Sequence, residues 1–223
     1  MGSFHPGPKQ ILIIANGAPL TGEHLRHLAD KASLIIGVDG GTQQAINAGL
    51  RVDLVLGDLD SLKTEVVQKL KGEGQTQFRT FAAEKDWTDT ELALQEVLRY
   101  QPAAVTVASG VGNRLDHSLA NLLLLAKYAP YFSALDLITV SGSVYYLCSS
   151  RPALDLWLEP GQLFSVIALD FAVSGVTIIN ARYPLYEVEL PFGSTLGISN
   201  IAVAAPVRIG LATGTCVVIV PKN

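Results

Sequence analysis

The stretch Asp-Leu-Val-Leu-Gly-Asp-Leu-Asp-Ser at residues 53–61 joins an apolar run to a turn that carries two carboxylates. A short apolar run bounded by turn residues is typical of a strand that is buried on both faces, as in parallel sheets covered by helices. A helical stretch is predicted directly after it, at 62–71. We therefore expect an α/β fold with this polar turn at the carboxyl end of a parallel strand, where such sheets bind ligands.

The same alternation of strand and helix extends over the first two thirds of the chain. Strands are predicted at 10–15, 33–38, 53–56, 104–108 and 135–140, and helices at 22–31, 42–48, 62–71, 89–99 and 115–128. After about Tyr145 the helical periodicity stops, and short strands separated by Gly and Pro are predicted at 153–158, 162–168, 176–180, 186–190, 198–205 and 215–220. This pattern predicts a parallel-sheet α/β domain at residues 1–145 and an all-β sandwich domain at 146–223.

Composition restricts the class of protein. The 223 residues are 49% hydrophobic and 16% charged, which favours a globular protein with a sizeable core. A net charge of −4 offers no basic surface for nucleic acid, and no apolar run approaches the roughly 18 residues of a membrane-spanning helix. No secretory signal is visible at 1–9, so we expect a cytoplasmic protein with neither nucleic acid nor membrane as partner. Cys148 and Cys216 fit no metal-ligand spacing and are expected to be buried thiols.

Asp58 and Asp60 form the first of three polar clusters. Residues two apart in an extended stretch share a face, so both carboxylates are expected to project together. Burying two nearby carboxylates costs free energy unless a cation or a proton lies between them. Mg²⁺ is the natural cation, since it binds one or two carboxylates and completes its shell with water and phosphate oxygens. A polar turn that caps a helix explains the same residues equally well.

The second cluster opens the helix that begins near Asp89. Thr88 and Glu91 have the spacing of a capping box, and Asp89 suits the positive end of the helix dipole. Lys85 and Asp86 come just before the cap, and capping does not explain them. They are either part of a binding site or an exposed ion pair.

The third cluster, residues 109–121, lies at a strand-to-helix turn. Its glycines let the backbone approach a ligand closely, and the free N–H groups at the start of the helix suit an anion. Arg114, His117 and Asn121 form a polar stripe on an otherwise Leu-rich helix, which indicates a cleft. The alternative is a satisfied ion pair between Arg114 and Asp116, with His117 in the core.

Taken together, these motifs resemble those of the thiamine pyrophosphokinase family. The matching segments, in chain order, are Asp39-Gly40-Gly41, Gly57–Ser61, Glu84–Leu94, Arg114–Asn121, Tyr183-Pro184-Leu185 and Gly193–Asn200. Asp39-Gly40-Gly41 alone would be read as a tight turn or a nucleotide contact. The combination spans nearly the whole chain, and its order makes it specific although each motif alone is weak.

The resemblance implies an α/β nucleotide-binding domain, a C-terminal β-sandwich that binds thiamine, and a homodimer with the substrate site at the subunit interface. It also implies the transfer of pyrophosphate from ATP to the hydroxyl of thiamine, which gives thiamine diphosphate and AMP. The residues it makes catalytic are Asp58, Asp60, Asp86, Asp89 and Arg114.

Binding roles are implied in the same way. The ligands of Mg²⁺ would be Asp58, Asp60 and Asp89, with Asp39 and Asp86 close by. The nucleotide would be bound by Asp39, Gly40, Gly41, Lys85 and Arg114. Thiamine would be bound by Asp116 and His117 and, from the partner subunit, by Tyr183, Ser199 and Asn200. An aromatic ring at position 183 suits stacking on a cationic ligand.

Two positions depart from the family pattern. Asn113 stands where a second Gly usually precedes the Arg, and Ile201 stands where a polar residue is common. Neither removes an implied metal ligand, so the departures bear on the acceptor more than on the reaction. The alternatives are a pyrophosphokinase for another alcohol, such as a hydroxymethylpterin, and a non-catalytic module that binds thiamine or a nucleotide. The Tyr183 and Gly193–Asn200 segments favour thiamine over a pterin, and the set of carboxylates favours catalysis over simple binding.

Overall fold

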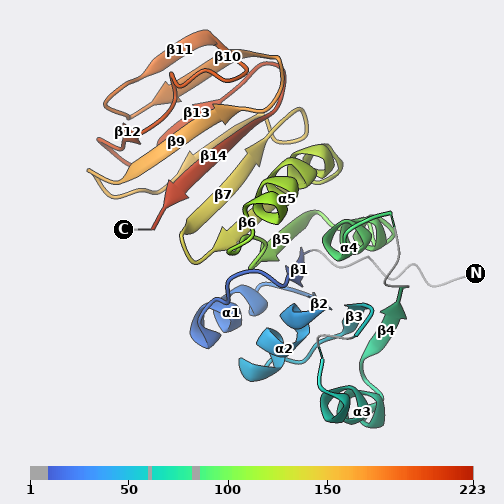
Figure 1. The fold of residues 1–223 in the computed structure, drawn as a ribbon. Helices are drawn as coiled ribbons and strands as arrows, with labels where there is room; N and C mark the ends of the chain where they lie inside the picture. The colour runs from blue at the N-terminus through green and yellow to red at the C-terminus, as the bar shows by residue number, and fades with distance from the viewer. Residues whose placement is uncertain (1–9, 60–61, 82–85, 223) are drawn as a thin grey trace, which may run out of the picture. The chain divides into compact units, whose positions relative to one another are not determined.

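The computed structural model describes residues 10–59, 62–81 and 86–222 (Figure 1). The chain divides into two compact units: unit 1 is residues 1–121 with 137–140, and unit 2 is residues 122–136 with 141–223. Ten of the described strands belong to a large sheet and four to a second, antiparallel sheet. The mixed α/β class predicted from the sequence is confirmed. Among the described residues, no helix has the length and apolar character needed to cross a bilayer.

Unit 1 contains five parallel strands connected by helices. The strands are β1 (Gln10–Ile14), β2 (Leu34–Val38), β3 (Leu54–Gly57), β4 (Gln77–Thr80) and β5 (Ala104–Ala108), and their hydrogen-bonded order is β5-β1-β2-β3-β4. The helices are α1 (Gly22–Ala29), α2 (Gly40–Asn47), α3 (Thr64–Glu73) and α4 (Asp89–Leu98). Helix α5 (Leu115–Tyr128) and strand β6 (Ala134–Thr139) contribute residues to both units. The strands and helices predicted for this part of the chain are therefore present.

The core of unit 1 forms where the sequence is most continuously apolar. Ile11, Leu12, Ile13 and Ile14 of β1 are each at most 1% exposed, since β1 lies between β2 and β5 and helix α2 packs on it. Helix α2 packs on β1 and β2, and α4 packs on β2 and β3. A fully buried aliphatic side chain of this size contributes about 1.5–3 kcal/mol through the hydrophobic effect. Because β1 is buried, the carboxyl end of this strand, and the loop that follows it, have a fixed position.

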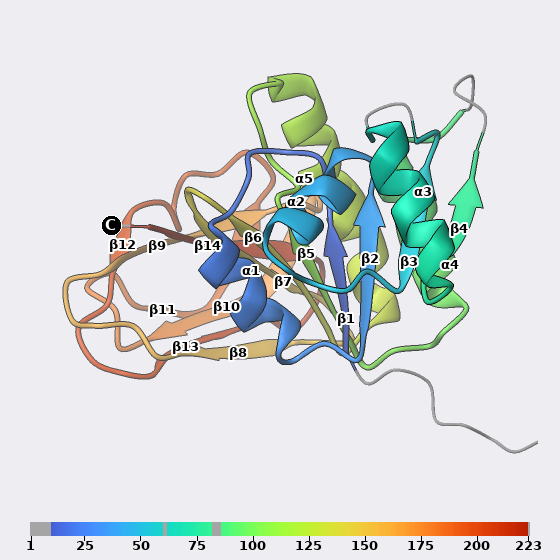
Figure 2. The ribbon, with the colours of Figure 1, turned by 90° about the horizontal axis from the view of Figure 1, so that it is seen from below.

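Strand β4 was not predicted from the sequence. Its four residues, Gln77–Thr80, are polar apart from Phe78, and it lies at one edge of the parallel strands (Figure 2). An edge strand has a single neighbour, here β3, and needs no apolar alternation when its side chains are exposed. For this reason hydrophobic periodicity does not reveal it.

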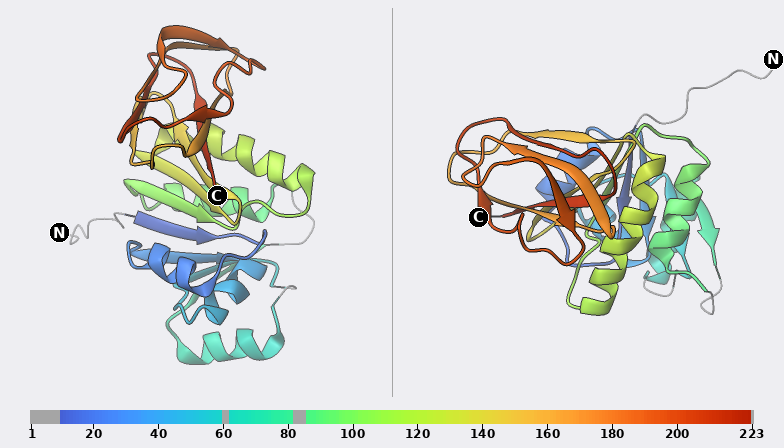
Figure 3. Two further views of the ribbon diagram at one scale, coloured as in Figure 1. Left: turned by 90° about the vertical axis from the view of Figure 1, so that its left-hand side faces the viewer. Right: turned by 90° about the horizontal axis from the view of Figure 1, so that it is seen from above.

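Unit 2 is formed mainly by antiparallel strands. These are β7 (Gly142–Leu147), β8 (Ala153–Leu156), β9 (Leu163–Ala168), β10 (Ala172–Ile179), β11 (Leu185–Pro191), β12 (Asn200–Ile201), β13 (Val207–Gly210) and β14 (Cys216–Pro221). They form two groups, β12-β9-β14-β7 and β11-β10-β13-β8. From Ala153 to Pro221 the described chain has strands and loops and no helix (Figure 3).

Both groups of strands contribute to one core. Phe164 and Val218 from the first group and Val173 and Ile178 from the second are fully buried there. Cys148 and Cys216 are buried and free, as expected from the sequence. Burial raises the pKa of Cys216 to about 12, so this sulfur stays protonated as a thiol.

The strand predictions for unit 2 are incomplete. Strands β7 and β13 were not predicted, and the strand predicted at 198–205 is wrong in length, because only Asn200–Ile201 forms one. The chain after Ile201 bonds to two different neighbours in turn: the N–H of Ala202 donates to Gln162 O (2.9 Å) and that of Val203 to Asn180 O (2.9 Å). This alternation ends the strand although the segment is apolar.

Candidate active site

Three parallel strands of unit 1 end at the same level. Ile14 of β1 is in register with Gly37 of β2 and with Ala108 of β5. The segments that follow these strands therefore leave from one edge of the sheet, which is the edge where open α/β sheets bind ligands.

Backbone hydrogen bonds continue beyond the ends of β1 and β5. The N–H of Gly17 donates to Ser109 O (2.7 Å), and that of Ala18 donates to Val111 O (2.8 Å). A Cβ atom on Gly17 would lie 2.3 Å from Ser109 O, so only glycine permits this approach. The two segments after the strands are thus locked together by their backbones.

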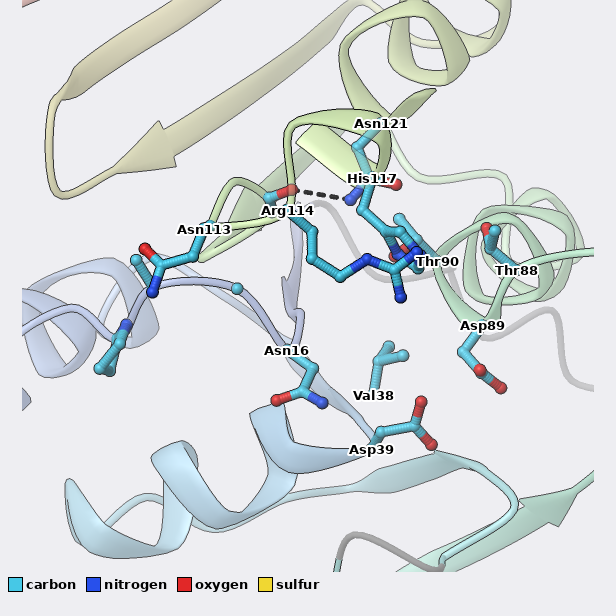
Figure 4. A pocket seen from close by; sticks show the side chains of 15 residues that line it. Asn16, Val38, Asp39, Thr88, Asp89, Thr90, Asn113, Arg114, His117 and Asn121 are labelled. Carbon is cyan, nitrogen blue, oxygen red and sulfur yellow. Dashed lines mark hydrogen bonds between the residues drawn. The ribbon is translucent and has the colours of Figure 1, made fainter. Parts of the chain in front are cut away.

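A pocket of about 710 Å³ opens beside these joined segments (Figure 4). The described residues that line it all belong to unit 1: Asn16, Gly17, Ala18, Pro19, Val38, Asp39, Thr88, Asp89, Thr90, Gly110, Gly112, Asn113, Arg114, His117 and Asn121. The carboxylates of Asp39 and Asp89 and the guanidinium of Arg114 extend into the same open space (Figure 4). The pocket therefore combines acidic groups with a cation.

Asp39 is held in an unusual backbone conformation at the start of α2. Its φ is +45°, its N–H donates to Leu56 O (3.0 Å), and its C=O accepts from the N–H of Thr42 (2.9 Å). Gly57 lies directly against the carboxylate, because a Cβ atom on Gly57 would come 1.7 Å from Asp39 Oδ1. A non-glycine residue at positive φ is rare and is found often at functional sites. The position of the Asp39 carboxylate thus depends on a glycine in the next strand.

Helix α4 places Asp89 at the pocket. Thr88 is its N-cap, and Thr88 Oγ1 accepts from the N–H of Glu91 (3.3 Å), as the capping box predicted. Asp89 is the first residue of the helix and is partly buried. Thr90 is buried beneath it and also lines the pocket. The cap therefore fixes the point at which the Asp89 carboxylate emerges.

The glycine loop after β5 is attached to α5 by two side chains. Asn121 Nδ2 donates to Gly110 O (2.7 Å; Figure 4). Ser118 Oγ accepts from the N–H of Gly112 (3.2 Å) and lies 2.8 Å from Arg114 O, to which it can donate. These contacts hold both ends of the loop at the start of the helix. Arg114, His117 and Asn121 all line the pocket, so the cleft expected beside the polar stripe is present.

Arg114 and Asp116 are paired with each other. Arg114 Nε donates to Asp116 Oδ1 (3.2 Å) and Nη2 to Oδ2 (2.6 Å), with both side chains largely exposed. The guanidinium, together with the backbone N–H of His117, lowers the pKa of Asp116 to about 2. The ion pair between these two residues is therefore present, whereas His117 is exposed and not in the core.

The remaining predicted residues are placed as follows. Asp58, which is partly buried after β3, and the exposed residues Asp86 and Asp116 do not line the pocket. Gly40 and Gly41 begin α2 behind Asp39. Asp60 and Lys85 lie outside the described residues. In unit 2, Tyr183 is 58% exposed, Ser199 is exposed and Asn200 is 2% exposed.

Asn16 lines the pocket and was not predicted. It packs against the start of α2, since a Cβ atom on Gly40 would lie 2.2 Å from Asn16 Oδ1. The signal was available in the sequence, because Asn16-Gly17 follows an apolar strand just as Asp39-Gly40 does. Its lack of charge made it less conspicuous than the acidic motifs.

The donor set at the pocket suits a hard divalent cation. Asp39 and Asp89 supply carboxylate oxygens, which Mg²⁺ prefers to nitrogen or sulfur ligands. Within the described part of the chain, no group of three or more potential ligands forms a complete metal site. Mg²⁺ usually retains waters and phosphate oxygens and needs only one or two carboxylates. The residues present therefore fit a metal that binds together with a polyphosphate.

Comparison with known proteins identifies the family. The pattern of the thiamin pyrophosphokinase catalytic domain matches residues 25–138, and that of the thiamin pyrophosphokinase vitamin B1 binding domain matches residues 154–216. The chain belongs to the thiamin pyrophosphokinase family. The resemblance drawn from the sequence motifs is thereby confirmed, and the protein is an enzyme of the thiamine diphosphokinase class.

Individual relatives agree with this assignment over nearly their whole length. The thiamine pyrophosphokinase of Bacillus subtilis (strain 168) is 29% identical over 211 residues, which are 95% of this chain and 98% of that protein. A crystal structure of thiamine pyrophosphokinase from Bacillus subtilis, with 27% identity, covers 96% of this chain and 100% of its own, with a TM-score of 0.84. One from Geobacillus thermodenitrificans, also 27% identical, covers 96% and 98%, with a TM-score of 0.81.

Proposed function

We propose that this protein transfers the pyrophosphoryl group of ATP to the hydroxyl of thiamine and releases AMP. In this reaction the thiamine oxygen bonds to the β-phosphorus, and the bond from that phosphorus to the α–β bridging oxygen breaks. The hydroxyl proton passes to a nearby carboxylate or to water. The observation that supports the proposal best is the pocket of unit 1, which is lined by Asp39, Asp89 and Arg114 together, in a chain of this family.

The nucleotide phosphates are proposed to bind in this pocket. Phosphoryl-type transfer asks a protein mainly for positioning and charge neutralisation. The Gly110–Asn113 loop can approach a phosphate closely because Ser118 and Asn121 already hold its backbone. Arg114 would contact the phosphates, which requires its guanidinium to leave Asp116 or to be shared with it. Gly40, Gly41 and Lys85 are proposed to contribute on the nucleotide side.

Mg²⁺ is the proposed metal. When bound, it supplies positive charge that neutralises the polyphosphate and so favours attack on the β-phosphorus. Its proposed ligands are Asp58, Asp60 and Asp89, with Asp39 and Asp86 nearby. Asp89 is supported by its place in the pocket and by the cap that fixes it.

Thiamine is proposed to bind to unit 1 of one subunit and to unit 2 of the partner subunit. Asp116 and His117 would meet thiamine from one subunit, and Tyr183, Ser199 and Asn200 would contribute from the partner subunit of a homodimer. The exposed ring of Tyr183 supports this, because an exposed aromatic face can stack on a cationic thiazolium.

The proposal includes the domain assignments and the location. Residues 1–145 would form the nucleotide-binding α/β domain, supported by the parallel pairing of β1 to β5. Residues 146–223 would form a β-sandwich, supported by the shared core of the two antiparallel groups of strands. A cytoplasmic location is consistent with two free, buried cysteines.

The test is a reconstitution with purified protein, ATP, Mg²⁺ and thiamine, in which AMP and thiamine diphosphate are followed by chromatography. We expect thiamine-dependent AMP with an equal amount of thiamine diphosphate, and no AMP without thiamine. AMP formed only with a hydroxymethylpterin would replace the acceptor. Folded protein that forms no AMP with either acceptor would support a binding module instead.

A further inference from the structure

We propose that Asn200 serves the thiamine site not by contacting thiamine, as the family resemblance implies, but as a positioning residue that holds the backbone of Tyr183. The proposal rests on the function above, in which the Tyr183 ring meets thiamine. The two residues of the Ser199-Asn200 motif would then have different roles: Ser199 would face the substrate, and Asn200 would face the protein.

The amide of Asn200 bonds to both backbone groups of Tyr183. Asn200 Oδ1 accepts from the N–H of Tyr183 (3.0 Å), and Nδ2 donates to the C=O of Tyr183 (2.7 Å). Oδ1 also accepts from the N–H of Ile201 (2.9 Å). A side-chain amide carries the same donor and acceptor as a peptide group. Asn200 thus does for Tyr183 what the backbone of a neighbouring strand would do.

The register of the chain explains why a side chain is needed here. Ala181 and Ala202 form an antiparallel bridge, and the N–H of Arg182 donates to Ile201 O (2.8 Å). Continuing this register places Tyr183 opposite Asn200. The backbone of Asn200 is already paired with Phe164 of β9, so its side chain bonds to Tyr183 instead.

Pro184 makes the position of Tyr183 more dependent on this contact. Proline has no N–H to donate, so the strand pairing cannot continue through residue 184. A residue before proline is also restricted to extended conformations. The two hydrogen bonds from Asn200 therefore hold the N–H and the C=O of Tyr183, the last residue before Pro184 and β11.

Burial separates the two residues by role. Asn200 is 2% exposed, and its amide reaches thiamine only by giving up three hydrogen bonds to the protein. Tyr183 is 58% exposed, so its ring is free to meet a ligand while its backbone is held. Ser199 has a φ of +55°, in the left-handed region, and is exposed. Ser199 and Tyr183 therefore remain as the substrate-facing residues of this region.

A double-mutant cycle tests the proposal. We expect Asn200→Ala and Tyr183→Ala each to raise the KM for thiamine about tenfold, with the KM for ATP unchanged within about twofold. If Asn200 acts through Tyr183, adding Asn200→Ala to Tyr183→Ala raises the thiamine KM by no more than about twofold. Two independent contacts would multiply to about a hundredfold, and that result would overturn the proposal.

Asn180→Gly is the matched control. Asn180 Nδ2 donates to Pro206 O (2.8 Å) in the same unit, and glycine retains the positive φ of +64° found there. We expect this variant to lower the Tm while leaving the thiamine KM unchanged. A rise in thiamine KM equal to that of Asn200→Ala would show that any loosening of unit 2 has the same effect, which would contradict a specific role.

Asn200→Asp and hydrogen exchange cover the cases in which Asn200→Ala fails to fold or the enzyme is inactive. Aspartate keeps an acceptor for the Tyr183 N–H, but it replaces the donor with an oxygen that repels the Tyr183 C=O and it buries a charge, so it should loosen Tyr183 at least as much as alanine does, and the same cycle can be run with it. Amide exchange at Tyr183, measured without substrate, should become at least about tenfold faster in either variant. Unchanged exchange would overturn the proposal. A wild-type enzyme that makes no thiamine diphosphate would instead reject the proposed function and leave the exchange result standing.

Discussion

The pocket of unit 1 and the Tyr183 segment of unit 2 are held in place in different ways. In unit 1, strand ends are joined by backbone hydrogen bonds and by contacts too close for any side chain, as at Gly17 and Gly57. In unit 2, one buried side-chain amide, that of Asn200, holds an exposed aromatic residue. The first arrangement is sensitive to added volume, and the second to the loss of a single amide.

The difference follows from what surrounds each region. Parallel strands buried on both faces leave their carboxyl-end loops packed against one another, so there the backbone determines the site. Tyr183 lies where strand pairing stops at a proline, so a side chain must replace the missing neighbour. The predictions below change a charge at the pocket, add volume beside a strand end, and break an exposed ion pair.

The largest effect is expected for Asp89→Asn. This change removes charge at the pocket without altering volume, and turnover should fall by at least about a hundredfold because the lost carboxylate acts on metal and phosphate. The fold should remain intact, with stability changed by about 1 kcal/mol or less from the helix dipole. Steady-state turnover and thermal unfolding measure the two effects.

Glu91→Gln is the matched control for Asp89→Asn. Glu91 is also acidic and lies in the first turn of α4, but it does not line the pocket. We expect a similar small change in Tm with turnover retained. If Asp89→Asn keeps wild-type turnover, the metal assignment in unit 1 is wrong.

A smaller but clear effect is expected for Gly57→Ala. The new Cβ would lie 1.7 Å from Asp39 Oδ1, and the φ of +137° is itself unfavourable for alanine. Displacement of the Asp39 carboxylate should raise the KM for ATP by about tenfold and lower stability by about 1–3 kcal/mol.

Gly72→Ala provides the comparison for Gly57→Ala. Gly72 lies within α3 with nothing near the position of a Cβ, so alanine there should raise stability by about 0.5–1 kcal/mol and leave activity unchanged. An unchanged ATP KM in Gly57→Ala would show that the backbone of unit 1 tolerates more volume than its contacts imply.

The sequence predicted those parts of the molecule that depend on apolar periodicity and local capping. The run Ile11–Ile14 predicted a buried strand, and Thr88 predicted the start of α4. Sequence also placed Asp39 and Asp89 at strand or helix ends, where both line the pocket. These features are local, so neighbouring residues determine them.

Features that depend on distant neighbours were not predictable in the same way. Strand β4 can be polar because it is an edge strand, and its own residues do not reveal that it pairs with β3. The motif that contains Asn200 does not show whether the Asn200 amide faces a ligand or faces Tyr183. The direction of this amide depends on the pairing of Ala181 with Ala202, residues about 20 positions apart in the chain. Asn16 joins the pocket only because β1 lies beside β2 and β5.

The smallest effect on stability is expected from breaking the Arg114–Asp116 ion pair, which is exposed and held by neither backbone packing nor burial. Arg114→Ala should raise the pKa of Asp116 from about 2 toward its ordinary value of 3.8. Because the pKa is lowered in the folded state, the pair contributes to stability above about pH 4 and loses that contribution as the pH falls toward about 2. An NMR titration of the Asp116 carboxyl measures the shift directly.

Arg99→Ala is the control, since that arginine pairs with Glu96 on α4 and should leave the pKa of Asp116 unchanged. An Asp116 that titrates near 3.8 in the wild-type protein would mean that the guanidinium is not held by the carboxylate in solution, so that no ion pair has to open before Arg114 meets a phosphate.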